Sequence, residues 1–363
     1  MKEFLVGMPL LLILVIYFII MLTSPVMAQS WSKGASMPTA RSEIAAANIG
    51  DDIYVVGGFD GSGDASDVVE LYNVKNNSWK SIASLPQALH HPAVASYDGK
   101  IYVVGGFISR EWTPTNRLFI YDPIKNQWTE GNSMPTPRGA LNALFVNGTL
   151  YAVGGQDDAR ILNINEAYDP LRDSWVPKAP MFTGRHHAAS TTVDNKIYVT
   201  GGRIAGSSPL VNVNVNEMYD IETDKWKQIE SMPSKRSGIT AATINNSFFV
   251  FGGEDITRTF GNNEKYETEN GKWTSLESMP TSRHGLAAVS VGNRIFVIGG
   301  GPEPGLSVSD VNEIYDDSIL NSNSTSKSSI NTTMPEHLPP QLSTAVNQVK
   351  FDRLSFNVFY LKD

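Results

Sequence analysis

Residues 128–155 read WTEGNSMPTPRGALNALFVNGTLYAVGG, and the same order of features recurs along most of this chain. A complete copy has a tryptophan, a Met-Pro pair, an arginine, an apolar run and a closing Gly-Gly pair. Six tryptophans each precede a Gly-Gly pair by 26 residues and follow one another at intervals of 47 to 51: Trp31, Trp79, Trp128, Trp175, Trp226 and Trp273. A period near fifty residues predicts a repeat architecture.

Each copy has the pattern of four short strands, which we letter a to d. Strand a begins near the arginine, b ends at Gly-Gly, c ends at a tyrosine and d begins at the tryptophan. Asn147-Gly148 separates a from b in the quoted copy, and such a pair favours a two-residue hairpin. Strand b is apolar almost throughout, as in Ile101–Val104, which is typical of a strand buried on both faces.

The two ends of the array predict how the copies close. Strand d appears alone at Trp31, whereas the last a-b-c set, from Arg283 to Tyr315, has no tryptophan after its tyrosine. One four-stranded sheet cannot bury both its faces, so the copies must pack on one another, and closure into a ring removes the open ends. We therefore predict an all-β fold, a six-bladed β-propeller of four-stranded blades that the strand at Trp31 closes.

This pattern resembles the kelch repeat family, in which Gly-Gly follows an apolar strand and Tyr, Trp and Met-Pro-x-x-Arg stand at fixed offsets. The resemblance covers residues 31 to about 317. The copies depart from it at a few positions: Leu85-Pro86, Leu89, Pro180-Met181 and Ser322. It implies an exported six-bladed kelch propeller, but a fold says little about function.

The composition excludes some classes of partner and chemistry. The 363 residues carry a net charge of −8 and no run of lysine or arginine, so we expect no nucleic-acid partner. The chain has no cysteine, which excludes disulfides and thiol chemistry.

The ends of the chain differ from the repeats. We predict that residues 1–28 form a signal peptide or an N-terminal anchor, because Phe4–Leu22 is uncharged and apolar and Val26-Met27-Ala28 suits signal peptidase. The propeller then occupies residues 29–317, a Ser/Asn/Thr/Pro-rich linker 318–348 and an apolar tail 349–363. We expect an extracytoplasmic monomer that contacts a membrane only through residues 4–22, if they are not cleaved.

Antiparallel strand order places the d-a and b-c loops on one face, where binding residues are expected. The candidates are the motif arginines and the residues after Gly-Gly: Arg41, Arg138, Arg185, Arg236, Arg283, Phe59, Phe107, Gln156, Arg203 and Glu254. Five arginines around a mouth would suit carboxylate or sulfate groups. Alternatively, they bond loop carbonyls or acidic neighbours and are structural.

Histidines recur eleven residues after the tryptophan in alternate copies, as His90, His186 and His284. Three imidazoles facing an axial channel could hold a metal, although opposed blades can lie too far apart. The adjacent His91 and His187 should point the opposite way, because strand neighbours alternate. We predict no metal and no cofactor.

The leading hypothesis is an exported, non-catalytic recognition module that binds a protein or a glycan through the d-a and b-c loops, with Phe59, Phe107 and Trp112 exposed. The alternative is a sugar mutarotase similar to N-acetylneuraminate epimerases, with its chemistry at four residues: Glu254, Asp255, Arg185 and Arg236. A deep pocket would favour the enzyme, and a broad rim with exposed aromatics the protein binder. Copper-radical oxidation, as in galactose oxidase, would need a Tyr-Cys crosslink and thus a cysteine.

Overall fold

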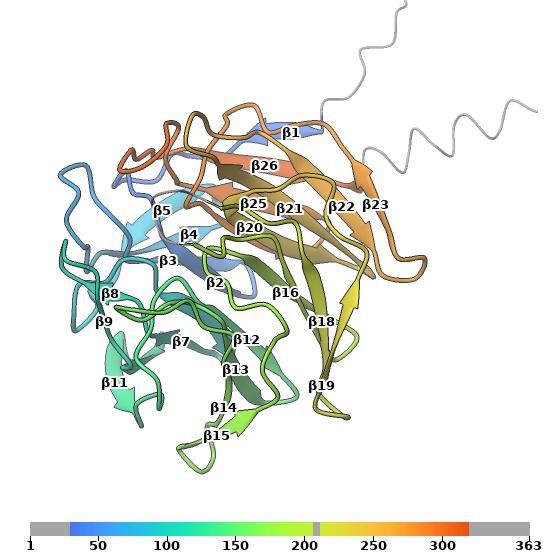
Figure 1. The fold of residues 1–363 in the computed structure, drawn as a ribbon. Coiled ribbons are helices and arrows are strands. Elements are labelled where there is room, and N and C mark those ends of the chain that lie inside the picture. The colour runs from blue at the N-terminus through green and yellow to red at the C-terminus, as the bar shows by residue number, and fades with distance from the viewer. Residues whose placement is uncertain (1–29, 206–210, 319–363) are drawn as a thin grey trace, which may run out of the picture. The chain divides into compact units, whose positions relative to one another are not determined.

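The computed structural model describes residues 30–205 and 211–318, which form a ring of six four-stranded sheets (Figure 1). This confirms the six-bladed β-propeller. The predicted signal peptide and C-terminal tail, and all of the linker except Ser318, lie outside the described residues. Within those ranges, no helix is both long and apolar enough to span a bilayer.

The blades share one strand order, from the channel outward. Blades 1 and 2 comprise β2 (Ala45–Ile49), β3 (Asp52–Val56), β4 (Val69–Asn73) and β5 (Ser78–Ser81), then β6 (Ala93–Tyr97), β7 (Lys100–Val104), β10 (Leu118–Asp122) and β11 (Gln127–Gly131). Blades 3 and 4 comprise β12 (Asn142–Val146), β13 (Thr149–Val153), β14 (Asn165–Asp169) and β15 (Ser174–Lys178), then β16 (Ala189–Val193), β17 (Lys196–Thr200), β18 (Asn216–Asp220) and β19 (Lys225–Ile229). Blades 5 and 6 comprise β20 (Ser237–Ile244), β21 (Ser247–Glu254), β22 (Asn263–Glu267) and β23 (Lys272–Ser275), then β24 (Ala287–Val291), β25 (Arg294–Ile298), β26 (Asn312–Asp316) and β1 (Trp31–Lys33). A two-stranded ribbon, β8 (Phe107–Ile108) with β9 (Thr113–Pro114), lies in the b-c loop of blade 2.

The turns between strands a and b follow the local sequence. β12 pairs with β13 so that Val146 faces Thr149, which leaves Asn147-Gly148 as the two-residue turn. Asn147 and Gly148 have φ values of 49° and 78°. Positive φ at both central positions is what a type I′ turn requires, so the hairpin prediction is confirmed.

The N-terminal strand closes the ring, as the sequence predicts. β1 pairs with β26 so that Trp31 faces Tyr315, and in Figure 1 the blue β1 lies beside the orange β26. Trp31 is buried, and its indole Nε1 donates to the carbonyl of Glu277 at 3.1 Å. Its ring packs against Phe251 and Tyr315. Aromatic burial therefore joins the two ends of the propeller.

Neighbouring blades pack through the buried strands and the paired glycines. One apolar cluster combines Val56 and Leu71 of blade 1 with Val103 and Phe119 of blade 2. A Cβ atom at Gly154 would lie 2.8 Å from the carbonyl oxygen of Arg185 in the next blade. The Gly-Gly pair is therefore the place where two blade backbones meet.

Inside five blades, the motif arginine is buried in an ion pair with a glutamate on the third strand. The pairs are Arg41–Glu70, Arg138–Glu166, Arg185–Glu217, Arg236–Glu264 and Arg283–Glu313, with N–O distances of 2.5 to 3.5 Å. The arginines have no exposed surface and also donate to backbone carbonyls of their own blade, as Arg41 does to Gly57 and Val68. Burial lowers the pKa of Arg185 to about 10, so it stays charged at neutral pH. Each arginine thus ties three strands of its blade together.

Blade 2 replaces both members of this pair. Leu89 stands where the other blades have arginine, and Phe119 stands where they have glutamate; both are buried. Two apolar side chains leave no charge unpaired, and such replacement of a buried ion pair is often neutral or stabilising. The departure from the motif at Leu89 is therefore accompanied by a compensating replacement of the glutamate by Phe119.

We expect Glu264→Ala to lower the free energy of unfolding by about 3 kcal/mol or more, because it leaves the buried Arg236 guanidinium without its carboxylate. Exchanging both residues, as Arg236→Leu with Glu264→Phe, should recover at least half of that loss, since it copies blade 2. Urea denaturation followed by tryptophan fluorescence measures both.

Glu222→Ala is the control, because Glu222 is exposed, and it should change the free energy of unfolding by no more than about 0.5 kcal/mol. If Glu264→Ala behaves like this control, the buried pairs do not stabilise the blades.

Candidate functional site

A ring of six equivalent residues surrounds the propeller axis where the d-a loops meet strand a. Each stands two positions after the motif arginine or its replacement: Glu43, His91, Ala140, His187, Gly238 and Gly285. All six have positive φ, between 52° and 65°. Five backbone N–H groups donate to the carbonyl of the preceding member at 2.9 to 3.2 Å, and the N–H of Ile44 completes the circle by donating to Gly285 at 3.4 Å. We call these residues the neck ring.

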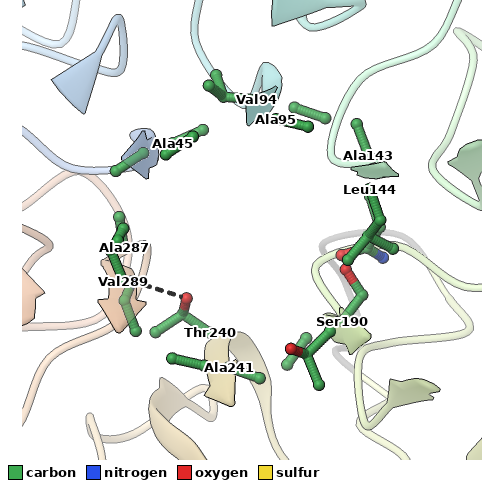
Figure 2. A pocket seen from close by; sticks show the side chains of 18 of the residues that line it. Ala45, Val94, Ala95, Ala143, Leu144, Ser190, Thr240, Ala241, Ala287 and Val289 are labelled. Carbon is green, nitrogen blue, oxygen red and sulfur yellow. Dashed lines mark hydrogen bonds between the residues drawn. The ribbon is translucent and has the colours of Figure 1, made fainter. Parts of the chain in front are cut away.

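Two hollows meet at the neck ring. On one side is the axial channel, about 390 Å³, between the first strands of the blades. Its described lining beyond the neck ring is apolar or uncharged, and Figure 2 shows small and hydroxyl side chains such as Ala45, Ser190 and Thr240 around it. On the other side is a larger hollow of about 1110 Å³, the mouth cavity. Glu43, His91 and His187 line both.

The mouth cavity is acidic and has an apolar rim. Among its described lining residues are six carboxylates and two arginines: Glu43, Glu111, Asp157, Asp158, Glu254, Asp255, Arg160 and Arg203. Both arginines pair with carboxylates of this same set, Arg160 with Asp157 at 2.7 Å and Arg203 with Glu254 at 2.8 Å. Three exposed aliphatic side chains also line it: Ile204, Ile256 and Leu306. They come from the b-c loops of blades 4, 5 and 6 in turn.

The structure separates the predicted site residues into two groups. Four of the residues after Gly-Gly line the mouth cavity: Phe59, Gln156, Arg203 and Glu254. The five motif arginines do not, since they are buried in their ion pairs: Arg41, Arg138, Arg185, Arg236 and Arg283. Phe107 is also absent from the lining, because it is fully buried with its ring over Gly139.

The expected exposed aromatics are mostly covered. Phe59 and Phe107 are 2% and 0% exposed, because their rings stack on the two faces of His90 at centroid distances of 4.0 and 5.3 Å. Trp112 is partly buried and lines the mouth cavity. The prediction of a broad aromatic rim is therefore wrong, and the mouth is a cavity.

The prediction that His90 and His186 face the axis, and that His91 and His187 point away from it, is wrong. His91 and His187 face the axis with ring centroids 4.6 Å apart, whereas His90 and His186 lie behind them. His90 and His91 do not alternate as strand neighbours would, because their Nδ1 atoms lie 2.7 Å apart. The backbone at His91 and His187 is left-handed (φ 53° and 55°), and it turns the second histidine of each pair toward the axis. The alternation of side chains along a strand assumes extended backbone and therefore does not predict this turn.

Hydrogen bonds define the tautomer of each inward histidine. Nε2 of His90 contacts the carbonyl of Ser109 at 3.0 Å; a carbonyl only accepts, so His90 donates there. Burial lowers the pKa of His90 to about 3, which leaves its Nδ1 unprotonated. The Nδ1 atoms of His90 and His91 are 2.7 Å apart, so His91 donates from Nδ1. Its Nε2 then faces the axis.

The second pair repeats this chain. Nε2 of His186 donates to Ala205 at 3.2 Å, and the two Nδ1 atoms of His186 and His187 are 2.7 Å apart. Burial lowers the pKa of His186 to about 3, and burial with the charge of Arg203 lowers that of His187 well below its usual value. His187 is thus a neutral imidazole at neutral pH, and it lines both hollows.

The carboxylate of Glu43 lies close to two histidines, His91 and His284. Its Oε2 is 3.1 Å from Nε2 of His91, and its Oε1 is 3.6 Å from Nε2 of His284. Burial alone would raise the pKa of Glu43, but His91, His284 and Arg203 lower it to about 2, so the group is a carboxylate. A Cβ at Gly285 would lie 2.6 Å from Cδ of Glu43. The glycine therefore leaves the space that this side chain occupies.

Comparison with known proteins agrees with the fold. Residues 53–301 match the family model described as Attractin/LZTR1 beta-propeller. The chain belongs to the Attractin/LZTR1 β-propeller family. The chain is also 30% identical over 234 residues to "Kelch-like protein terF" of Aspergillus terreus, which covers 60% of this chain and 51% of that protein. It therefore spans about half the length of this curated relative.

The solved structure described as "Structure of YjhT" superposes on this Attractin/LZTR1 propeller with a TM-score of 0.68 at 18% identity. The match covers 77% of this chain and 96% of the other. At this identity the likeness shows the shared fold alone.

Sequence reasoning missed the cluster of Glu43, His91 and His187 in this Attractin/LZTR1 propeller. A signal was present: at one repeat position the six copies have Glu, His, Ala, His, Gly and Gly. Glycine suits a position that needs positive φ, and non-glycine residues there are uncommon. Three ionisable side chains at such a position indicate a functional site.

We expect Gly285→Ala to destabilise the propeller by about 2 kcal/mol more than Gly292→Ala, because the added Cβ overlaps the Glu43 carboxylate. Gly292 is the matched control: its φ of 61° is close to the 59° of Gly285, yet nothing lies within 4 Å of an added Cβ. Both variants carry the conformational cost of an alanine with left-handed backbone. The difference between their urea unfolding midpoints therefore measures the cost of the overlap with Glu43. Equal midpoints would mean that Glu43 moves aside freely.

Proposed function

We propose that this protein is an exported, non-catalytic recognition module that binds a partner protein at its mouth cavity. A basic side chain of the partner enters the cavity, and apolar residues beside it contact the rim. The observation that carries this proposal is the combination of an acidic hollow with three exposed aliphatic side chains around it.

Charge supports a basic ligand group. The two arginines that line the mouth cavity are already paired with Asp157 and Glu254, so the remaining carboxylates leave an excess of negative charge. Buried Glu43 and Glu254 line the cavity together with the partly buried Trp112. Carboxylates and aromatic faces both attract an ammonium or guanidinium group.

The rim supports a protein partner over a sugar. Ile204, Ile256 and Leu306 are 42%, 69% and 61% exposed, and they belong to three consecutive b-c loops. Exposed aliphatic side chains clustered beside a cavity are typical of protein interaction sites. The b-c loops are also the part of the repeat whose length varies, which suits a binding role.

The cavity at the mouth favours the mutarotase alternative, but the two arginines assigned to that alternative do not line it. The alternative relied on Arg185 and Arg236 to hold a sugar carboxylate, but both are fully buried and paired with Glu217 and Glu264. An acidic cavity also repels an anionic sugar. Export is part of the proposal on the evidence of the N-terminal sequence alone.

The test uses short peptides in which lysine or arginine stands between leucine and isoleucine, with fluorescence anisotropy on the full mature chain. We expect such peptides to bind, with an affinity that falls as salt rises. Ile256→Ser combined with Leu306→Ser should weaken binding at least about tenfold, or about 1.4 kcal/mol, because it removes the rim contact.

Leu171→Ser is the matched control, since Leu171 is 96% exposed in the turn between β14 and β15 and does not line the mouth cavity. It should bind like the wild type. If peptides with glutamate in place of the basic residue bind equally well, the proposal is wrong. Binding of uncharged oligosaccharides without any peptide binding would instead favour the glycan hypothesis.

A further inference from the structure

We propose that Glu43, His91 and His187 form a binding site for one divalent transition-metal ion at the neck ring. One ligand atom from each residue lies within 4.8 Å of the other two. The set offers two imidazole nitrogens and one carboxylate oxygen, which zinc, cobalt and ferrous iron accept. This inference rests on the geometry of the neck ring and is independent of the proposed function.

Both imidazoles are oriented as ligands by the hydrogen bonds behind them. Nδ1 of His91 lies 2.7 Å from Nδ1 of His90, whose Nε2 contacts the carbonyl of Ser109 at 3.0 Å; in the same way, Nδ1 of His187 lies 2.7 Å from Nδ1 of His186, whose Nε2 contacts the carbonyl of Ala205 at 3.2 Å. Metal-binding histidines commonly donate their other N–H to a partner that holds the ring in place. Two copies of the same chain of contacts thus hold the rings of His91 and His187, whose centroids are 4.6 Å apart, beside each other.

Among the described residues, the contact of Nε2 of His91 is with the Glu43 carboxylate. This nitrogen is buried and makes no hydrogen bond, although Oε2 of Glu43 is only 3.1 Å away, because that contact lacks hydrogen-bond geometry. A buried, unpaired polar atom is costly. A cation between the imidazole and the carboxylate would satisfy both.

The distances require only small movements. Ligand atoms about 2.0 to 2.1 Å from a tetrahedral ion lie about 3.4 Å from one another. The His91–Glu43 contact is already close to this value, and the third atom is within 4.8 Å.

A second candidate group, Glu43 with Glu254 and His284, also has its ligand atoms within 4.8 Å of one another, but its histidine is occupied. Nδ1 of His284 contacts the carbonyl of Gly301 at 3.1 Å, and Nε2 contacts that of Gly305 at 2.9 Å. Both ring nitrogens of His284 therefore already face backbone carbonyls, unlike Nε2 of His91. Glu254 is bound to Arg203. The metal therefore belongs with His91 and His187.

Three protein ligands leave at least one coordination position open. Because Glu43, His91 and His187 also line the mouth cavity, that position faces the hollow through which the ion and a further ligand can arrive. The ring neighbours Ala140, Gly238 and Gly285 have small or no side chains and keep the approach clear.

The experiment measures binding of Zn²⁺ and of Co²⁺ alone to the full mature chain after removal of metal with a chelator. Isothermal titration calorimetry should give one ion per chain, and Co²⁺ should show visible absorption of a low-symmetry site. His187→Ala should lower the Zn²⁺ affinity at least 100-fold and abolish the Co²⁺ spectrum. Alanine is compatible with this place, because Ala140 occupies the equivalent ring position with φ 53°; Glu43→Gln is a second variant of nearly the same shape.

The matched control is His337→Ala, a histidine outside the described residues, which should bind like the wild type. Equal affinity of the wild type and His187→Ala, or no binding by the wild type, would overturn the proposal. So would loss of binding in His284→Asn with retention in both His187→Ala and Glu43→Gln, because the ion would then occupy the other group.

Discussion

The circle of backbone hydrogen bonds at the neck ring is the constraint on which the rest of the propeller depends. Each blade contributes one residue that must adopt positive φ, so that its N–H reaches the carbonyl of the preceding blade. This contact brings the first strands together around the axis and leaves the channel between them. Any side chain carried by a ring residue lies near the axis. The left-handed backbone therefore brings side chains from different blades together, at a cost in conformational energy.

The buried arginine–glutamate pairs hold each blade to that geometry. An arginine such as Arg283 contacts Glu313 on the third strand and carbonyls of its own blade, so it joins the start of the first strand to the outer sheet. Blade 2 reaches the same packing with Leu89 and Phe119. Either solution leaves no buried charge unpaired, which is the physical requirement; a mixed pair would violate it.

The charged residues that recur in five blades and the charged residues that line the mouth cavity are different residues. The motif arginines are buried in ion pairs inside the blades, whereas the groups that face the mouth cavity, such as Glu43 and Glu254, come from positions where the residue type differs between copies. The segment from the tryptophan to Gly-Gly, whose length is constant, supplies the frame and the neck positions, whereas the b-c loops, whose length varies, supply the rim. Both proposed sites therefore lie at positions where the copies differ from one another.

The sequence by itself determined the number of blades, the strand order and the closure of the ring at Trp31, because these follow from local patterns repeated six times. It also placed Phe59, Gln156, Arg203 and Glu254 at the mouth, since antiparallel order sets which loops share a face. Only the tertiary structure decided that Arg185 and its equivalents are buried, that Phe107 packs inward and that His91 and His187 face the axis. Those outcomes depend on contacts between blades and on positive φ, which alternation along a single strand does not encode.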